Sequence, residues 1–561
     1  MFFPCFLNHM KPSVSPPVVH IHDAVFTVRH RSIALIMVGS LAFVCIAVLV
    51  SSSQAQKADT SDRKSFAPEI PKTWDDEAMA TLEVPLANPV GSPKHVSADY
   101  YYHIPVRPIY KSYPVYVPDH ESPGYMEWLK QQEPEIVWGL DPKTGVEHTP
   151  PLKTEADWIK AGEMVFDSPI IFTEPPPPQL VRQLYEAGGR PVPSSGIDPF
   201  VVWVIRQKGK VEAAFAACAD CHTRVLPDGS VIKGAQGNNP IDHGIALALR
   251  GQLAATQNDK ALLGFVRLGE RSQFEAPWLQ PFEHPDYGVM SVQEIASTHA
   301  AIPAGVFARQ GTSVLSPPHI PDLIGVKAGH YLDATGLQKQ RSIVDLMRYA
   351  ALNQGADMLA NYDGFIPADI PNFKKLPDPD KLSGPAAQPS RYSDEQLYAL
   401  AQYVYSLQRP SNPNKLDAVA SRGQKVFERE ACAMCHTPPL YTNNKLTLAE
   451  GFIPPPGAEK KYDILPISVG TDPSLALRTR RGTGYYKVPS LKGVWYRTMF
   501  GHSGWCATLE DWFDPRRTRD DYIPTGFKPY GAESYAVKGH PFGLNLSEED
   551  RKALIAFLKT L

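Results

Sequence analysis

The sequence predicts a mainly α-helical fold of two related domains, interrupted by long irregular proline-rich loops and insertions. Three observations predict it: a cysteine-histidine motif occurs twice, a capped amphipathic helix is expected twice, and proline is abundant. The 55 prolines among 561 residues are about twice the usual share. Runs such as EPPPPQL (174–180) and IPPPG (453–457) favour extended connections over regular structure.

Length and composition indicate a globular chain with more than one domain. The chain is too long for one ordinary hydrophobic core. Apolar residues make up 43% and charged residues 20%, and the formal net charge is −3. This balance gives no basic footprint for nucleic acid or for an anionic membrane surface.

The N-terminal region contains an export signal or a membrane anchor. Residues 33–50 form an uncharged apolar run, preceded by Arg29, His30 and Arg31 and followed by SSSQAQ. The run is long for a cleaved signal and short for a transmembrane helix, so both remain open, with a buried core helix as a third interpretation. In the first two cases the chain from about residue 56 onward is exported to the periplasm, with residues 33–50 as its candidate anchor in the inner membrane.

Two C-x-x-C-H motifs stand far apart in the chain, in AACADCHTR (216–224) and ACAMCHTP (431–438). With 7 cysteines and 17 histidines in 561 residues, chance gives roughly 0.003 such motifs. The two copies of the motif are therefore expected to serve a chemical function. Its residues are Cys218, Cys221 and His222 in the first copy and Cys432, Cys435 and His436 in the second.

Covalent haem attachment explains both copies. Two residues between paired cysteines make a strained disulfide loop, and zinc modules place their two pairs much closer together. In a c-type haem site the two thiols add to the vinyl groups, and the adjacent histidine becomes the proximal iron ligand. We expect two covalently bound c-type haems and their iron, with zinc or disulfides as the alternatives.

An internal repeat surrounds the two motifs. The segment 393–407 aligns without a gap on 547–561, and both open with a serine cap before an apolar helical face. GEMVF (162–166) and GQKVF (423–427) are expected on a first helix of each unit. The expected organisation is a 1–32 N-terminal region, a 33–55 signal or anchor, a 56–98 linker, and cytochrome c-type domains over 99–410 and 411–561.

The two irons are expected to differ in ligation. In the second unit His540 lies shortly before the final helix, where it suits the distal position, with Met499 and His502 as rivals and a surface histidine as the alternative. The equivalent stretch of the first unit, 361–392, contains no His, Met or Cys. We therefore expect the first iron to be open or weakly ligated. Histidines that its insertions could supply, each better explained by a structural role, are His243, His299, His319 and His330.

Segments 482–514 and 539–561 resemble the C-terminal part of bacterial dihaem cytochrome c peroxidases and the MauG group. The first unit, with KGAQGNNPID, PPHIPDLIGVKAGHYLDATG and DLMRYAALNQGAD, resembles the RoxA-type branch that includes rubber oxygenases. The resemblance covers about residues 100–561. It implies that the N-terminal haem reacts and the C-terminal haem relays electrons, and it places His540 in the region of the distal ligand.

The chain departs from this pattern in two places. It is shorter than rubber oxygenases after the second motif, and their active-site aromatic residues have no clear counterpart, so polymer cleavage is not expected. Tyr485 and Tyr486 lie near the position of the haem-ligand tyrosine in MauG-like proteins. Packing at a strand edge is the alternative role for both.

The sequence therefore predicts an exported dihaem oxidoreductase that reacts with peroxide or O₂ at the first haem. A small redox protein is the expected electron donor or acceptor. A non-enzymatic dihaem electron carrier is the main alternative, and an enzyme that oxidises a partner protein is a third. No catalytic residue beyond the haem ligands is assigned.

Covalent attachment gives a direct test. The intact mass of the purified protein should exceed that of its polypeptide by two haems, because thioether bonds survive denaturation. Cys218→Ala and Cys432→Ala should each weaken one attachment. Release of both cofactors on denaturation would contradict the assignment.

Overall fold

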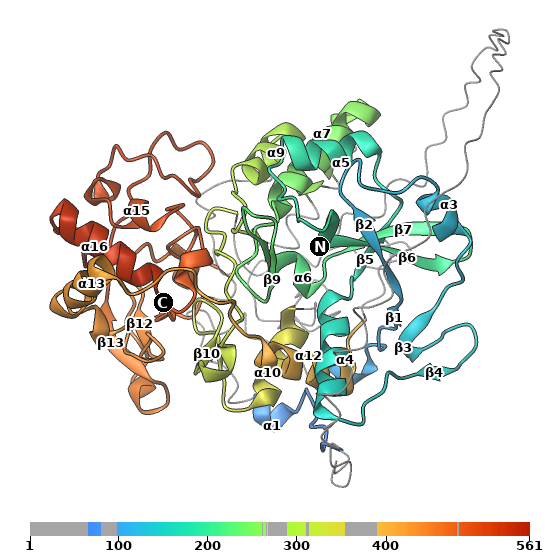
Figure 1. The fold of residues 1–561 in the computed structure, drawn as a ribbon, viewed down its shortest axis with the longest axis horizontal. Helices are drawn as coiled ribbons and strands as arrows, with labels where there is room; N and C mark the ends of the chain where they lie inside the picture. Colours follow the sequence, from blue (N-terminus) through green and yellow to red (C-terminus); the bar gives the residue numbers. More distant parts are fainter. Residues whose placement is uncertain are drawn as a thin grey trace, which may run out of the picture.

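The computed structural model describes residues 66–79, 98–260, 262–264, 266–267, 289–309, 314–353, 390–479 and 482–561. Figure 1 shows the residues after about 411 on one side of the molecule and most of the earlier residues on the other. The boundary at 410/411 remains a prediction from the sequence.

Two helix pairs confirm the predicted repeat. Helix α4 (Glu155–Asp167) packs on α12 (Asp394–Ser406), and α13 (Ala418–Arg429) packs on α16 (Glu548–Lys559). The side chains of Ser393 and Ser547 accept hydrogen bonds from backbone N–H groups three residues on, as predicted for the two caps. Figure 1 shows the second pair at the outer end of the molecule.

Both pairs cross at a glycine. A Cβ added to Gly162 would lie 2.0 Å from the carbonyl oxygen of Ala399, and one added to Gly423 would lie 1.8 Å from that of Ala553. Next to each crossing an aromatic pair packs, with ring centroids 5.2 Å apart for Phe166 and Tyr403 and 5.4 Å apart for Phe427 and Phe557. Tyr403 and Phe557 thus make core contacts next to the two crossings.

Most of the remaining helices are short, with the exception of α7, which has 16 residues. The α-helices are α1 (Asp76–Met79), α2 (Ala98–His103), α3 (Tyr125–Lys130), α5 (Pro178–Glu186), α6 (Cys218–Cys221), α7 (Ile241–Thr256), α9 (Val292–Ala300), α10 (Ile343–Ala351), α14 (Ser474–Leu477) and α15 (Leu509–Trp512). The 3₁₀ helices are η4 (Val326–Ala328), η7 (Cys432–Met434), η8 (Ala458–Lys460), η9 (Val494–Tyr496) and η10 (Pro515–Thr518).

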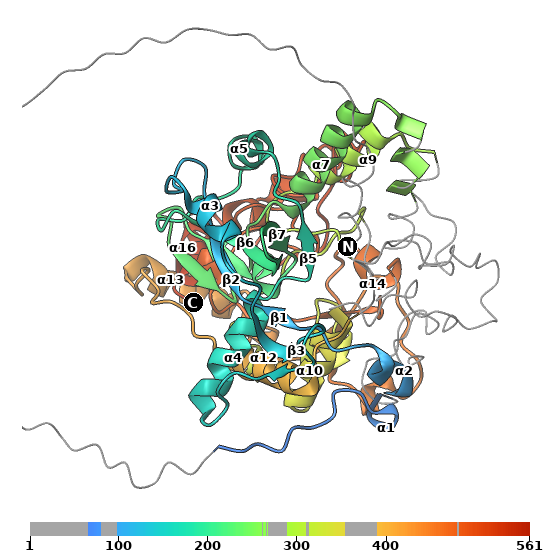
Figure 2. The same cartoon turned by 90° about the vertical axis from the view of Figure 1, so that its right-hand side faces the viewer.

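A four-stranded antiparallel sheet positions the first motif. Its strand order is β2-β6-β7-β5, and Figure 2 shows it beside the α4/α12 pair. A two-residue turn with Gly209 at a φ of 81° joins the central strands. The chain leaves this sheet directly into the first motif. Its strands are β2 (Ser112–Tyr116), β5 (Ile171–Thr173), β6 (Ile197–Gln207) and β7 (Lys210–Phe215).

Smaller sheets complete the fold. In the sheet of order β13-β12-β14, strand β12 pairs parallel with β13 and antiparallel with β14. Tyr485 and Tyr486 are buried on its edge strand, which supports the strand-edge role for Tyr485, whereas Tyr486 also lines the cavity beside the second motif. The remaining strands are β1 (Ile109–Tyr110), β3 (Ile136–Leu140), β4 (Glu147–His148), β8 (Thr223–Val225), β9 (Val231–Lys233), β10 (Tyr331–Leu332), β11 (Gln338–Lys339), β12 (Leu446–Leu448), β13 (Ile464–Ser468) and β14 (Tyr485–Lys487).

The prediction of a mainly α fold is wrong. Helices hold 35% and strands 15% of the described residues, and the strands form several sheets. Part of the difference lies in the insertion between Phe166 and Cys218, which contains β5, β6 and β7. There β6, with the sequence IDPFVVWVIRQ, is rich in the β-branched and aromatic residues that suit a pleated surface.

The expectation of a transmembrane segment is also corrected. Within the described ranges, no helix combines the length and apolar composition that a membrane crossing requires. The apolar run 33–50, on which that expectation rested, lies outside the described residues.

The glycine crossings give a test of the fold. Gly423→Ala should lower the stability of the second helix pair by about 1–3 kcal/mol, because the added methyl group collides with a backbone carbonyl that cannot move freely. The matched control is Gly251→Ala on α7, where a Cβ would meet no atom within 4 Å and helix propensity favours alanine. Thermal unfolding measures both. Equal midpoints for the two variants would contradict the crossing.

Candidate haem sites

The first motif forms one turn of helix. Cys218 and Cys221 open and close α6, so both thiols project from the same side of the turn. His222 follows, and its backbone N–H donates to the carbonyl of Cys218 at 3.0 Å. The thiols are not joined in a disulfide, and burial raises the pKa of Cys221 to about 12. This turn matches the spacing that two thioether bonds to one ring require.

The imidazole of His222 is held by a proline carbonyl. Its Nδ1 lies 3.0 Å from the carbonyl oxygen of Pro321, so Nδ1–H donates and Nε2 keeps its lone pair. Burial lowers the pKa of His222 to about 4. The ring is therefore neutral near pH 7 and can act as a metal ligand.

The second motif repeats this arrangement. Nδ1 of His436 lies 3.2 Å from the carbonyl oxygens of both Tyr441 and Pro489. Burial lowers the pKa of His436 as well. Both motif histidines thus keep Nε2 available on the side away from a proline carbonyl.

The two prolines belong to a second internal repeat, which the sequence analysis missed. Residues 320–326 read IPDLIGV and residues 488–494 read VPSLKGV. In each, a glycine with positive φ, Gly325 at 87° and Gly493 at 77°, precedes the 3₁₀ helix η4 or η9. The shared pattern I/V-P-x-L-x-G-V was the signal that could have revealed it.

His540 faces His436 across a gap. The ring centroids are 6.5 Å apart and the ring planes are inclined by 55°. Two metal–imidazole bonds of about 2.0 Å each, plus roughly one ångström from nitrogen to ring centre on each side, would separate the rings by roughly 6 Å. Burial lowers the pKa of His540 to about 3, with the His436 and Arg517 side chains adding to the shift. Both rings are neutral, and the gap fits one iron atom.

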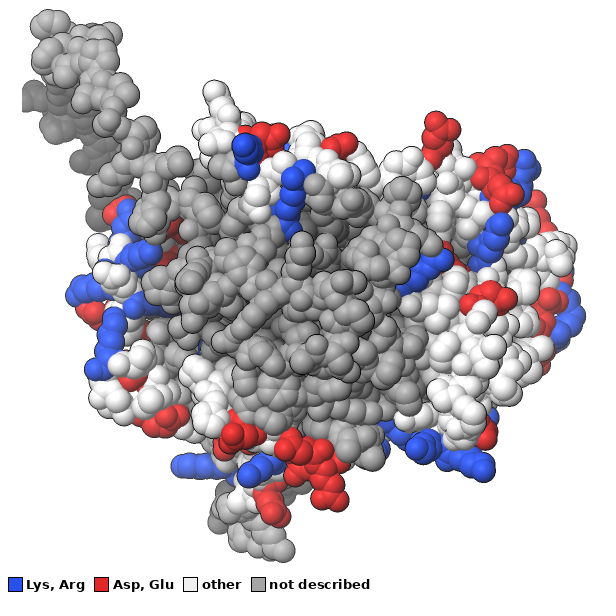
Figure 3. All heavy atoms as spheres, turned by 180° about the vertical axis from the view of Figure 1, so that it is seen from behind, with Lys and Arg blue, Asp and Glu red and all other residues white. Residues whose placement is uncertain are grey.

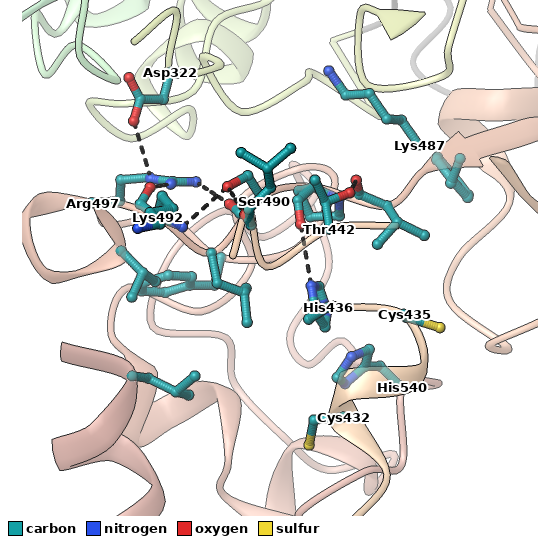
Figure 4. A pocket seen from close by; sticks show the side chains of 18 of the residues that line it. Asp322, Cys432, Cys435, His436, Thr442, Lys487, Ser490, Lys492, Arg497 and His540 are labelled. Atoms are coloured by element: carbon teal, nitrogen blue, oxygen red, sulfur yellow. Dashed lines mark hydrogen bonds and ion pairs between the residues drawn. The ribbon is translucent and has the colours of Figure 1, made fainter. Parts of the chain in front are cut away.

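The two histidines line a cavity of about 590 Å³. Figure 4 shows Cys432, Cys435, His436 and His540 around it. Its walls carry aromatic side chains that suit a large flat apolar group, and the half-buried Lys487 is also a lining residue. Several residues of the segment 319–334 also line the cavity, so both predicted domains contribute to it. The donor set and the volume fit a c-type haem.

The rival ligands of the second site are engaged by other side chains, although His502 lines the same cavity. Nε2 of His502 lies 2.8 Å from Oγ1 of Thr471, and its ring stacks on Tyr486 at 3.5 Å. Met499 packs with the apolar residues of the cluster that contains Trp505 and does not line the cavity. These contacts favour His540 as the distal ligand.

The other histidines considered for the first site have partners. His243 contacts the carbonyl of Gly188, His299 pairs with buried Asp242 at 2.7 Å, His319 contacts the carbonyl of Gly501, and His330 lies 3.5 Å from Asp463. Most of the donor-free stretch 361–392, residues 361–389, lies outside the described residues. An open sixth position at the first site therefore stays a prediction.

Zinc is the alternative to haem that the sequence left open. Among the described residues, no group of three or more His, Cys, Asp or Glu side chains is arranged to hold a metal ion. On the face seen in Figure 3, Lys and Arg are interspersed with Asp and Glu over the described part of the surface.

No protein family profile and no curated protein sequence matches the chain. Among solved structures, the chain is similar to hydrazine synthase of Kuenenia stuttgartiensis, with 16% identity over 53% of this chain and 87% of that one, and a TM-score of 0.28. It is also similar to a MauG-like protein associated with microbial copper homeostasis, with 19% identity over 53% and 88% of the two chains and a TM-score of 0.27. Similarity at this level carries no argument about function. The RoxA-type assignment is not tested by either structure and stays a prediction.

Proposed function

We propose that the chain is a dihaem c-type oxidoreductase that reacts with peroxide or O₂ at its first haem site and relays electrons through its second. The observation that carries the proposal is the pair His436 and His540, neutral and facing each other at 6.5 Å beside two motif thiols. Two protein ligands on one iron are typical of electron transfer, whereas iron that does chemistry keeps one face available.

Seven side chains would hold the two cofactors. The haem irons supply the redox chemistry when bound. The thiols and histidines in question are Cys218, Cys221 and His222 at the first site, and Cys432, Cys435, His436 and His540 at the second.

The chain's own contribution is orientation, burial and a short route between the sites. The carbonyl of Pro321 accepts the hydrogen bond from His222, and Pro321 also lines the cavity of the second site. One residue thus contacts both sites. Carbonyl acceptors fix the tautomer and orientation of each proximal ring, and the apolar walls limit access of water.

A non-enzymatic electron carrier is the alternative. It would have strong protein ligands on both faces of both irons, and both haems would be low-spin. The donor-free sequence 361–392 favours the enzyme, because no usual distal ligand stands there. Absorption spectra of the oxidised and half-reduced protein, with a peroxide titration, distinguish the two functions. An enzyme should show one high-spin component that changes on addition of peroxide.

Export is part of the proposal, since covalent haem assembly and the order of basic, apolar and polar residues over 29–56 both favour the periplasm. A reporter enzyme fused after residue 100 should be active only outside the cytoplasm. Activity of the fusion inside the cytoplasm would contradict export.

Removal of the distal ligand tests the assignment of the second site. His540→Ala should convert the low-spin haem to a high-spin or new ligand state and slow electron delivery about tenfold or more, because the iron loses its second protein ligand. Cyanide should still bind the first haem. His502→Ala is the control, because its ring is engaged with Thr471 and Tyr486, and it should keep the low-spin spectrum. Loss of that spectrum in His502→Ala, with retention in His540→Ala, would reverse the assignment.

A further inference from the structure

Arg517, on η10, is a buried cation beside the loop that carries His540. Its side chain has no exposed surface. The guanidinium donates to the carbonyl oxygens of Trp512 at 2.8 Å, Gly539 at 3.0 Å and His540 at 2.9 Å, and also to that of Val537. Arg517 thus gathers two chain segments, around 512 and around 537–540, on one planar group.

Burying the charged side chain of Arg517 costs free energy, so its position needs a structural explanation. None of the ion pairs within the described residues includes Arg517, so carbonyl dipoles and the face of the Trp512 ring compensate its charge. Burial lowers the pKa of Arg517 from its ordinary value. A buried cation without a carboxylate is expensive, and an apolar side chain would be the cheaper way to fill the space.

The backbone of His540 needs outside support. His540 has a φ of 46°, in the left-handed region that a residue with a side chain seldom occupies, and such strain persists only where the surroundings fix it. The backbone N–H of His540 donates to the carbonyl of Val469 at 2.6 Å, and Arg517 binds the carbonyls of Gly539 and His540. Both peptide groups of His540 are therefore held.

Arg517 also supports the imidazole ring through Trp512. The guanidinium lies over the Trp512 ring at 4.5 Å, and that ring lies 5.4 Å from the ring of His540. Trp512 lines the cavity. One side chain thus controls both the backbone conformation of His540 and an aromatic wall beside its ring.

We propose that Arg517 is the positioning residue that presents His540 to the iron of the second haem. The inference rests on the proposed function, which assigns His540 as the distal ligand. It adds a specific cause. The planar arrangement of N–H donors in the guanidinium group, and not only its charge, keeps the imidazole ring of His540 facing the ring of His436. Lysine cannot replace Arg517, because an ammonium group cannot span four carbonyls from one plane.

Two variants separate geometry from charge. Arg517→Lys keeps the charge and loses the planar arrangement of donors, while Arg517→Gln loses both. We expect both purified holoproteins to show a loss of about threefold or more in the bis-histidine low-spin signal by electron paramagnetic resonance. Added imidazole should restore a low-spin signal, because it can occupy the position that His540 has left. The reduction potential of the second haem should shift in both variants.

Arg348→Gln is the matched control. Arg348 is also a buried arginine, which donates to the carbonyl of Thr73 and pairs with Asp345 at 3.1 Å, and it does not line the cavity. This variant should lose stability and keep the full bis-histidine signal.

The outcomes separate the inference from the proposed function. A wild-type protein without a bis-histidine signal would contradict the proposed function. A wild-type signal that persists at full strength in Arg517→Lys and Arg517→Gln would overturn the positioning role alone. If neither Arg517 variant accumulates while Arg348→Gln does, Arg517 serves the folding of the whole domain, and the positioning role is likewise overturned.

Discussion

The second site depends on the separation that the fold imposes between two histidine rings. His436 and His540 come from distant parts of the chain, yet their rings face each other with 6.5 Å between centroids. Neutral rings at this separation attract each other weakly, so the gap has to be imposed by the backbone around them. Proline and tyrosine carbonyls fix His436, while the carbonyl of Val469 and the guanidinium of Arg517 fix the loop of His540. The surrounding fold supplies these anchors.

The same local arrangement of residues appears at both motifs. In each, a motif histidine donates from Nδ1 to a proline carbonyl, and that proline begins a segment that ends in a glycine with positive φ and a 3₁₀ helix. In each, a helix bearing GxxVF crosses the last helix of the unit at a glycine. The repeat therefore reaches beyond the cofactor motif into the packing around it. The two units differ mainly in their insertions and in what the chain offers opposite the motif histidine.

Local signals predicted much of this from the sequence. The motif turn, the serine caps and the two helix pairs rest on residues close together in the chain, and His540 could be singled out because it precedes a predicted helix. The proline contacts could not be found this way, since Pro321 lies 99 residues from His222 whereas Pro489 lies 53 from His436. Arg517 gave no signal, because its role depends on carbonyls brought together only by folding. The insertion strands were missed because proline content was given more weight than the β-branched and aromatic residues of β6.

The central claim is that one iron lies between His436 and His540 while the other keeps a face free for reaction. The most direct measurement is the electron paramagnetic resonance spectrum of the fully oxidised wild-type holoprotein, with near-infrared magnetic circular dichroism to identify the ligands. The account predicts one low-spin haem with two histidine ligands and one high-spin haem in equal amounts. Two low-spin haems with protein ligands on both faces, or no bis-histidine component at all, would contradict it.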